Sequence, residues 1–169
     1  MIESRYLEDN IENIQKLMSI PGLKNFEAKS VGKLIKLSKV REYKDGEVII
    51  QEGEQDPWMY ILLSGKIRIF KENHEIAMIE KKGEIFGEMR IIDSKARSAS
   101  AAAVGKTVCL AVNTTAKNRL STVTTEEDRL DFLLLLYRVF AEYMSVRLRA
   151  ADDELVAAKK KIKHLISKI

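Results

Sequence analysis

A short segment in the middle of the chain, residues 86–101, carries the side chains best suited to bind a small anion. Gly87 has no Cβ, so the backbone can approach a ligand closely there. The amide groups that open a short helix after it would attract negative charge. Arg97, nine residues after Glu88, offers a planar set of donors for phosphate oxygens. An ionised Glu88 only accepts hydrogen bonds, and a sugar hydroxyl is a suitable donor to it.

This segment resembles the phosphate-binding cassette of the cyclic nucleotide-binding domain family. The resemblance lies in Gly87 and Glu88, followed at the family's spacing by Arg97, Ser98 and Ala99. It extends loosely over residues 14–150, and the better matching flanks are residues 43–54, 58–70 and 82–85. The alternative is that Glu88 and Arg97 only form a surface ion pair on a turn.

The resemblance implies a role for each residue around the phosphate. Glu88 would accept a hydrogen bond from the ribose 2′-hydroxyl, and Arg97 would donate to the exocyclic phosphate oxygens. The backbone amides of Arg90 and Ser98 would complete the anion site. A small residue is usual in the family at position 90. An outward Arg90 side chain would be harmless, whereas an inward one would suit a ligand with more charge or impair binding.

The resemblance also implies contacts to the base. Ile69 and Met78 would pack on the ring, and Asp152 on the long helix would accept hydrogen bonds from the purine, unless it is only a solvated acid. The Ser98 hydroxyl could favour guanine, but serine also occurs in family members that bind cAMP. We expect cAMP rather than cGMP as the ligand. The predicted ligand-binding residues are Ile69, Met78, Gly87, Glu88, Met89, Arg90, Arg97, Ser98, Ala99 and Asp152.

Composition is that of a globular protein, with 46% hydrophobic and 32% charged residues. The net charge of +4 permits anion binding but does not demand nucleic acid. The single cysteine, Cys109, cannot form an internal disulfide. The N-terminus has no apolar signal core, and no apolar run is long enough to span a membrane. We therefore expect a cytoplasmic protein. His74 and His164 lie in unrelated segments, so neither a metal site nor an enzyme is expected.

Glycine divides the chain into three parts. Six of the eight glycines lie between residues 46 and 105, among short apolar segments typical of a jelly roll. The predicted fold class is α+β, a β-roll or jelly roll of about eight antiparallel strands with short N-terminal helices and a long C-terminal helix. Residues 1–40 are assigned to the N-terminal helices, 41–113 to the roll and 114–169 to the C-terminal helices. The expected strands are residues 48–51, 59–63, 67–70, 76–79, 99–104 and 107–112, and the helical stripe before them contains Val31, Leu34, Ile35 and Ser38.

The last part reads as one helix from about Glu126, with Thr124 or Thr125 as its N-cap. Apolar residues recur at alternating intervals of four and three from Leu130 to Ile169, the pattern of a coiled coil. This predicts a homodimer through residues 130–169. The alternative is a single helix packed in a monomer.

Together these features predict a homodimeric cyclic nucleotide sensor that transmits ligand binding to a separate, unidentified effector protein. Two alternatives stay open: a structural dimerisation module that keeps the fold but binds no nucleotide, and a segment of a longer regulated protein. A transcription factor of the catabolite-activator type would continue into a helix-turn-helix, so DNA binding is not expected. The lysines between residues 159 and 168 are expected to form a solvated face, and the alternative is contact with nucleic acid or an acidic surface.

Overall fold

The computed structural model describes residues 1–6, 11–19, 23, 28–89, 93, 95–114 and 126–168. They form two compact units, Met1–Phe132 and Leu133–Ile169. The larger unit contains all strands of the described part of the chain, and the smaller unit is the greater part of one long helix. The predicted limits at residues 40 and 113 stay a prediction.

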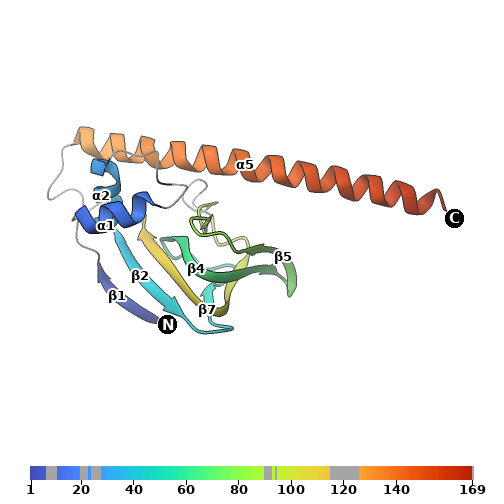
Figure 1. Ribbon diagram of the computed structural model, residues 1–169, viewed down its shortest axis with the longest axis horizontal. Coiled ribbons are helices and arrows are strands. Elements are labelled where there is room, and N and C mark those ends of the chain that lie inside the picture. The colour runs from blue at the N-terminus through green and yellow to red at the C-terminus, as the bar shows by residue number, and fades with distance from the viewer. Residues whose placement is uncertain are drawn as a thin grey trace. The chain divides into compact units, whose positions relative to one another are not determined.

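An antiparallel sheet of seven strands forms the larger unit within the described residues (Figure 1). The strands are β1 (Ile2–Tyr6), β2 (Ser38–Tyr43), β3 (Val48–Ile50), β4 (Trp58–Lys71), β5 (His74–Ile79), β6 (Ile85–Phe86) and β7 (Ser100–Asn113). Their order is β1-β2-β7-β4-β5, while β3 pairs with β7 and β6 pairs with β4. This sheet, with helices before and after it, confirms the predicted α+β roll.

Two pairs of the six expected strands are continuous in the structure, which leaves four, and β1, β2 and β6 bring the count among the described residues to seven. β4 and β7 each run for 14 residues, and each contains a glycine with positive φ, Gly65 at 92° and Gly105 at 69°. A Cβ on Gly65 would lie 2.6 Å from both the Lys106 carbonyl oxygen and Thr107 Oγ1. These glycines therefore bend long strands that cross closely, instead of ending them.

The N-terminal segment is not only helical. Helices α1 (Ile11–Met18) and α2 (Ala28–Lys36) lie side by side, and α2 buries Val31, Leu34 and Ile35 as its stripe predicts. Ser38, which the stripe assigned to this helix, instead begins β2, and its hydroxyl donates to the Leu34 carbonyl oxygen at 2.6 Å. The strand β1, which pairs with β2, has no counterpart in the sequence prediction.

The core of the larger unit lies between the two faces of the rolled sheet. Tyr60 and Phe86 stack there with their ring centroids 5.1 Å apart. Cys109 is fully buried in the same cluster, and burial raises the pKa of its thiol to about 12. A thiol in that state is unreactive, as its place in an apolar run predicts. The cluster also contains Tyr43, Ile49, Ile50, Leu62, Ile67, Ile79, Ala101, Ala103 and Ala111.

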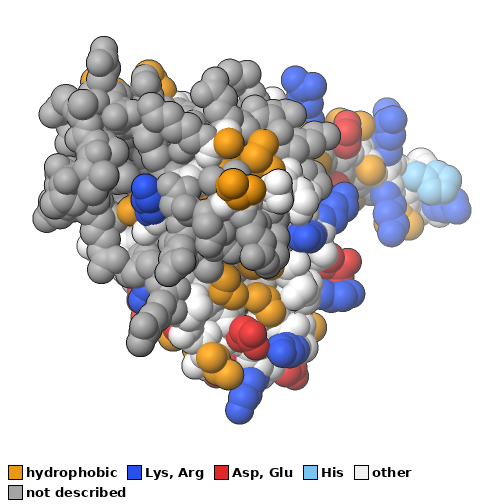
Figure 2. All heavy atoms as spheres, turned by 60° about the vertical axis from the view of Figure 1, so that its left-hand side comes forward, with side chains coloured by type: hydrophobic (Ala, Val, Ile, Leu, Met, Phe, Trp, Pro, Cys, Tyr) orange, Lys and Arg blue, Asp and Glu red, His pale blue; other side chains and the backbone are white. Residues whose placement is uncertain are grey.

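The long helix is α5 (Glu126–Ile166), 41 residues in length. Thr124 and Thr125, its expected N-caps, lie outside the described residues. Figure 2 shows orange hydrophobic side chains between blue lysine and arginine side chains on this helix. No helix among the described residues is long and apolar enough to cross a membrane. The large apolar residues of the four-three repeat that α5 exposes are Leu130, Leu134, Tyr137, Leu148, Leu155, Ile162 and Leu165.

Candidate functional site

The cassette begins where the short strand β6 ends in a left-handed glycine. Gly87 has a φ of +74°, and a Cβ at this position would lie 2.9 Å from Arg97 Nη1 and 2.8 Å from Ile50 Cδ1. The Gly87 carbonyl oxygen accepts a hydrogen bond from Arg97 Nη1 at 2.6 Å. The missing side chain therefore makes room for the guanidinium of Arg97, which the sequence prediction did not foresee.

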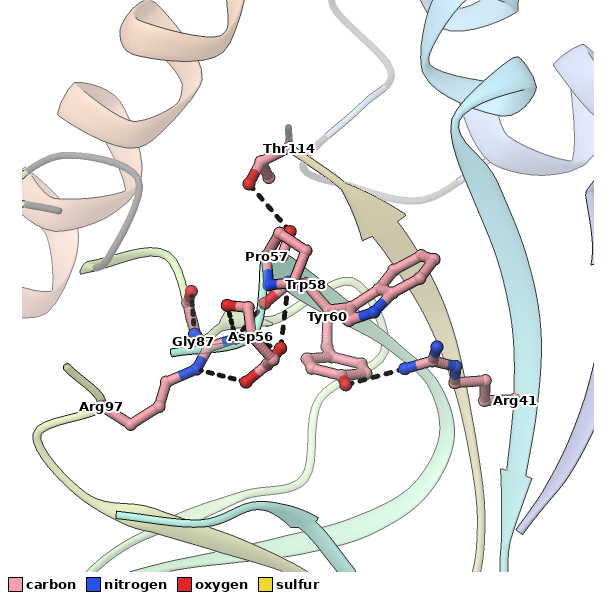
Figure 3. Close-up of polar contacts among 8 residues, drawn as sticks. All are labelled: Arg41, Asp56, Pro57, Trp58, Tyr60, Gly87, Arg97 and Thr114. Atoms are coloured by element: carbon pink, nitrogen blue, oxygen red, sulfur yellow. Dashed lines mark hydrogen bonds and ion pairs between the residues drawn. The ribbon is translucent and has the colours of Figure 1, made fainter. Parts of the chain in front are cut away.

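Arg97 is 6% exposed, and its guanidinium is held by the turn that leads into β4 (Figure 3). Nε and Nη2 donate to the two carboxylate oxygens of Asp56, at 3.0 and 2.8 Å. Nη2 also donates to the Trp58 carbonyl oxygen. A guanidinium has five N–H donors. After the bond to Gly87, the second N–H of Nη1 is the one that has no hydrogen-bond partner among the described residues.

Asp56 is the residue of this site that the sequence prediction missed. Its ion pair with Arg97 leaves 28% of the Asp56 side chain and 3% of the Arg97 side chain exposed. Burial raises the pKa of the Asp56 carboxyl. The hydrogen bonds from Arg97 and from the Trp58 amide lower this pKa by more than burial raises it, so it lies below its usual value. Nε and Nη2 of the guanidinium that is predicted to bind phosphate thus both contact this carboxylate.

Glu88 is buried too, with 3% of the residue exposed. It has an interaction partner within the fold. Since the ion-pair partner of Arg97 is Asp56 and both Glu88 and Arg97 are buried, the alternative of a surface pair between these two residues is wrong.

Backbone hydrogen bonds fix the loop that carries Arg97. The Arg97 amide donates to the Glu54 carbonyl oxygen, and the Gly53 amide donates to the Arg97 carbonyl oxygen, both at 2.9 Å. The Glu52 amide donates to the Ser100 hydroxyl at 2.9 Å. The turn after β3 therefore sets the position of Arg97 before any ligand is considered.

The pairing of β4 with β5 shows how the two residues expected to contact the base are oriented. Ile69 pairs with Ala77, and Met78 pairs with Arg68. Because paired residues share a face of the sheet and neighbours alternate, Met78 lies on the opposite face from Ile69. Ile69 packs against the core cluster, whereas Met78 is 38% exposed. Ala77, not Met78, shares the face of Ile69.

The remaining predicted residues are distributed as follows. Met89 is 48% exposed, and the Ser98 hydroxyl lies 3.6 Å from its sulfur, beside a partly buried Ala99. Arg90 lies outside the described residues. Asp152 is exposed on the part of α5 that belongs to the smaller unit. No group of three or more potential metal ligands occurs in the described part of the chain.

The family model described as "Cyclic nucleotide-binding domain" matches residues 40–125, about half of the chain, and this range contains the whole cassette. The chain belongs to the cyclic nucleotide-binding domain family. The matched range therefore includes the segment around Arg97 that resembles the phosphate-binding cassette of this family.

Two curated relatives are named for different cyclic nucleotides. The "Cyclic AMP receptor protein" of Thermus thermophilus is 33% identical over 126 residues, which are 68% of this chain and 51% of that protein. The human "cGMP-dependent protein kinase 2" is 35% identical over 103 residues, 57% of this chain and 14% of the kinase. The chain thus spans about half of the first relative and a small part of the second.

Solved structures agree on the fold. A putative cyclic nucleotide-binding protein from Geobacter metallireducens superimposes with a TM-score of 0.67 and is 19% identical. The similarity covers 79% of this chain and 96% of that one. At this identity the similarity concerns the architecture of the roll and its helices.

Proposed function

We propose that this domain is a sensor for a cyclic purine nucleotide, with cAMP favoured over cGMP, and that it has no catalytic activity of its own. The observation that carries the proposal is the buried Arg97, oriented by Asp56 and Gly87, with one N–H of Nη1 that no described residue accepts. The relative that matches the longer part of the chain is named for cyclic AMP. The cytoplasmic location, the absence of DNA binding and the unidentified effector stay predictions.

We infer that fewer nitrogen atoms of Arg97 contact the phosphate than the sequence suggested. Asp56 occupies Nε and Nη2 of Arg97, so the exocyclic phosphate oxygen would bind through Nη1 alone. A charge-assisted hydrogen bond in a desolvated site is strong even when it is single. Glu88 would accept from the ribose 2′-hydroxyl, and the amides of Arg90 and Ser98 would add donors to the phosphate. Ile69 would contact the base.

We also infer that two copies pair in parallel and in register through residues 130–169. If Leu148 and Leu155 occupy the first apolar position of the heptad, Arg147 and Glu154 precede them at the flanking g position. In a parallel pair, g residues face the e residues five positions later on the other helix. Arg147 would then face Asp152 of a second copy, and Glu154 would face Lys159 of that copy. Both pairs have opposite charges.

Calorimetry with cAMP, cGMP and 5′-AMP tests the proposed function. We expect the cyclic nucleotides to bind, cAMP more tightly than cGMP, and 5′-AMP to bind more weakly because its doubly charged phosphate does not match a site with one donor arginine. Absence of heat with both cyclic nucleotides, from protein that unfolds cooperatively, would favour the alternative of a dimerisation module without a ligand.

A further inference from the structure

A second buried arginine, Arg41 on β2, has no part in the binding site described above. It is 8% exposed, and its guanidinium carbon lies 4.1 Å from the centroid of the Trp58 ring (Figure 3). Its Nη1 donates to the Tyr60 hydroxyl at 2.9 Å, and its Nε donates to the Glu3 carboxylate at 2.6 Å. Arg41 thus joins the N-terminal strand β1 to the aromatic start of β4.

Trp58 links this arginine to the arginine of the cassette. Its ring packs under Arg41, while its carbonyl oxygen accepts from Arg97 Nη2 and its amide donates to Asp56 Oδ1 at 3.0 Å. The side chain and the main chain of one residue therefore touch both guanidinium groups. A shift of the Trp58 main chain together with its ring would move both the carbonyl oxygen that accepts from Arg97 and the amide that binds Asp56.

The turn that contains Asp56 and Trp58 is also fixed from its other side. Both the amide and the hydroxyl of Thr114 donate to the Pro57 carbonyl oxygen, at 2.9 and 2.8 Å. The Trp58 ring is only partly buried, so packing of the core does not hold it alone. A guanidinium stacked on an indole in a desolvated setting contributes a substantial attraction.

We propose that Arg41 is a positioning residue for ligand binding: by stacking on Trp58 it holds the turn that aims Arg97 at the phosphate. Glu3 supports it by holding the Arg41 guanidinium in place, together with Lys39, which donates to the other oxygen of Glu3. The proposal rests on the proposed function for its claim that Arg97 binds phosphate. The position of Arg97 itself is observed without ligand. It gives the N-terminal strand β1 an influence on a site that it does not touch.

The substitution Arg41→Met tests this, because methionine keeps much of the apolar stem and removes the guanidinium. We expect the affinity for cAMP to fall about tenfold, which corresponds to about 1.4 kcal/mol. Arg68→Met is the matched control, since the Arg68 guanidinium also lies over an aromatic ring, Phe70 at 5.1 Å. Among the described residues, no hydrogen bond or ion pair joins it to Asp56 or Arg97. Its affinity should stay within about twofold of the unmodified protein.

A double-mutant cycle separates positioning from a general loss of structure. In an Arg97→Lys background, the Arg41→Met change should cost much less than tenfold, because the group that it positions is gone. Fully additive losses would overturn the proposal. Trp58→Phe keeps an aromatic ring that attracts a cation less strongly, so it should lower the affinity for cAMP by less than Arg41→Met does. It replaces Arg41→Met as the test if that variant does not fold.

A ligand-free readout distinguishes failure of this inference from failure of the proposed function. In 15N-labelled protein, the Nε–H resonance of Arg97 reports its hydrogen bond to Asp56. We expect its exchange with water to be slow in the unmodified protein and in Arg68→Met, and clearly faster in Arg41→Met. An unchanged exchange rate in Arg41→Met contradicts the positioning role, whether or not cAMP binds.

Discussion

The two units of this chain treat charge and apolar surface in opposite ways. In Met1–Phe132, Arg41 and Arg97 are buried and paired with carboxylates, and an apolar cluster around Tyr60 and Phe86 is enclosed. In Leu133–Ile169, large apolar residues such as Leu148 and Leu155 are exposed at regular intervals between charged residues. The larger unit thus pairs its buried charges internally, whereas the helix exposes apolar residues that a second helix would bury. The predictions below test each side of this contrast.

The largest effect is expected at Arg97. Arg97→Ala should nearly abolish cAMP binding, because loss of a charge-assisted contact in a buried site costs at least about 1.5–3 kcal/mol. It should also lower the free energy of unfolding, since Asp56 would be left half-buried without its cation. Calorimetry and denaturant titration measure the two effects. Unchanged affinity in a folded variant would remove Arg97 from the site.

A substitution at Leu155 tests whether the exposed apolar residues of the helix pair with a second copy. A charge on the apolar seam should prevent pairing, because burial of one leucine contributes about 1.5–3 kcal/mol. Leu155→Lys should therefore sediment as a monomer at micromolar concentration, while the control Leu155→Ile stays dimeric. Both should retain the cooperative unfolding of the roll. An unmodified protein that sediments as a monomer, with or without cAMP, would rule the coiled coil out.

A smaller and more selective effect is expected at Glu88. Glu88→Gln should weaken binding of cAMP more than binding of 2′-deoxy-cAMP, because only cAMP carries the hydroxyl that Glu88 is proposed to accept. Calorimetry with the two ligands gives the ratio directly. Equal losses for both would mean that the buried carboxylate shapes the loop instead of reading the sugar.

The Asp56 pair predicts a dependence of stability on pH. The pKa of Asp56 is lower in the folded chain than its ordinary value, so the folded state favours the ionised form. This stabilisation is fully present above the ordinary aspartate pKa and is lost as pH falls through the lowered value. Acid titration of the unfolding free energy should therefore be shallower in Asp56→Asn than in the unmodified protein. Identical curves would show that the pair contributes nothing.

Arg90 is expected to matter least. If its amide alone meets the phosphate, Arg90→Ala should bind cAMP within a few-fold of the unmodified protein. A large loss would mean that the side chain enters the site, and a gain would mean that it obstructs the ligand.

The sequence predicted what depends on neighbours in the chain. Gly87, Glu88 and Arg97 lie within one short stretch of the sequence, and the repeat of α5 lies within one helix, so the sequence alone reveals both patterns. The partner of Arg97 was not, because Asp56 is 41 residues away and only the folded sheet brings the two together. Burial of an arginine pair around Trp58 depends on the same long-range contacts.

Whether Met78 shares the face of Ile69 depends on strand register. A slip of one residue in strand register moves every side chain to the other face. The register of β4 and β5 is set by the tight turn at Glu72 and Asn73, both with positive φ, and by an irregularity between Ile69 and Phe70. Alternation of apolar residues alone does not reveal such an irregularity, so the choice between Ala77 and Met78 needed the structure.

The central claim is that a cyclic nucleotide phosphate binds the one remaining N–H of an arginine already held by Asp56. A crystal structure of the full chain with cAMP tests it most directly. We predict the exocyclic oxygen within hydrogen-bond distance of Arg97 Nη1, with Nε and Nη2 still bonded to Asp56. A nucleotide bound away from Arg97, or an Arg97 that leaves Asp56 to grip the phosphate with both edges, would contradict this account.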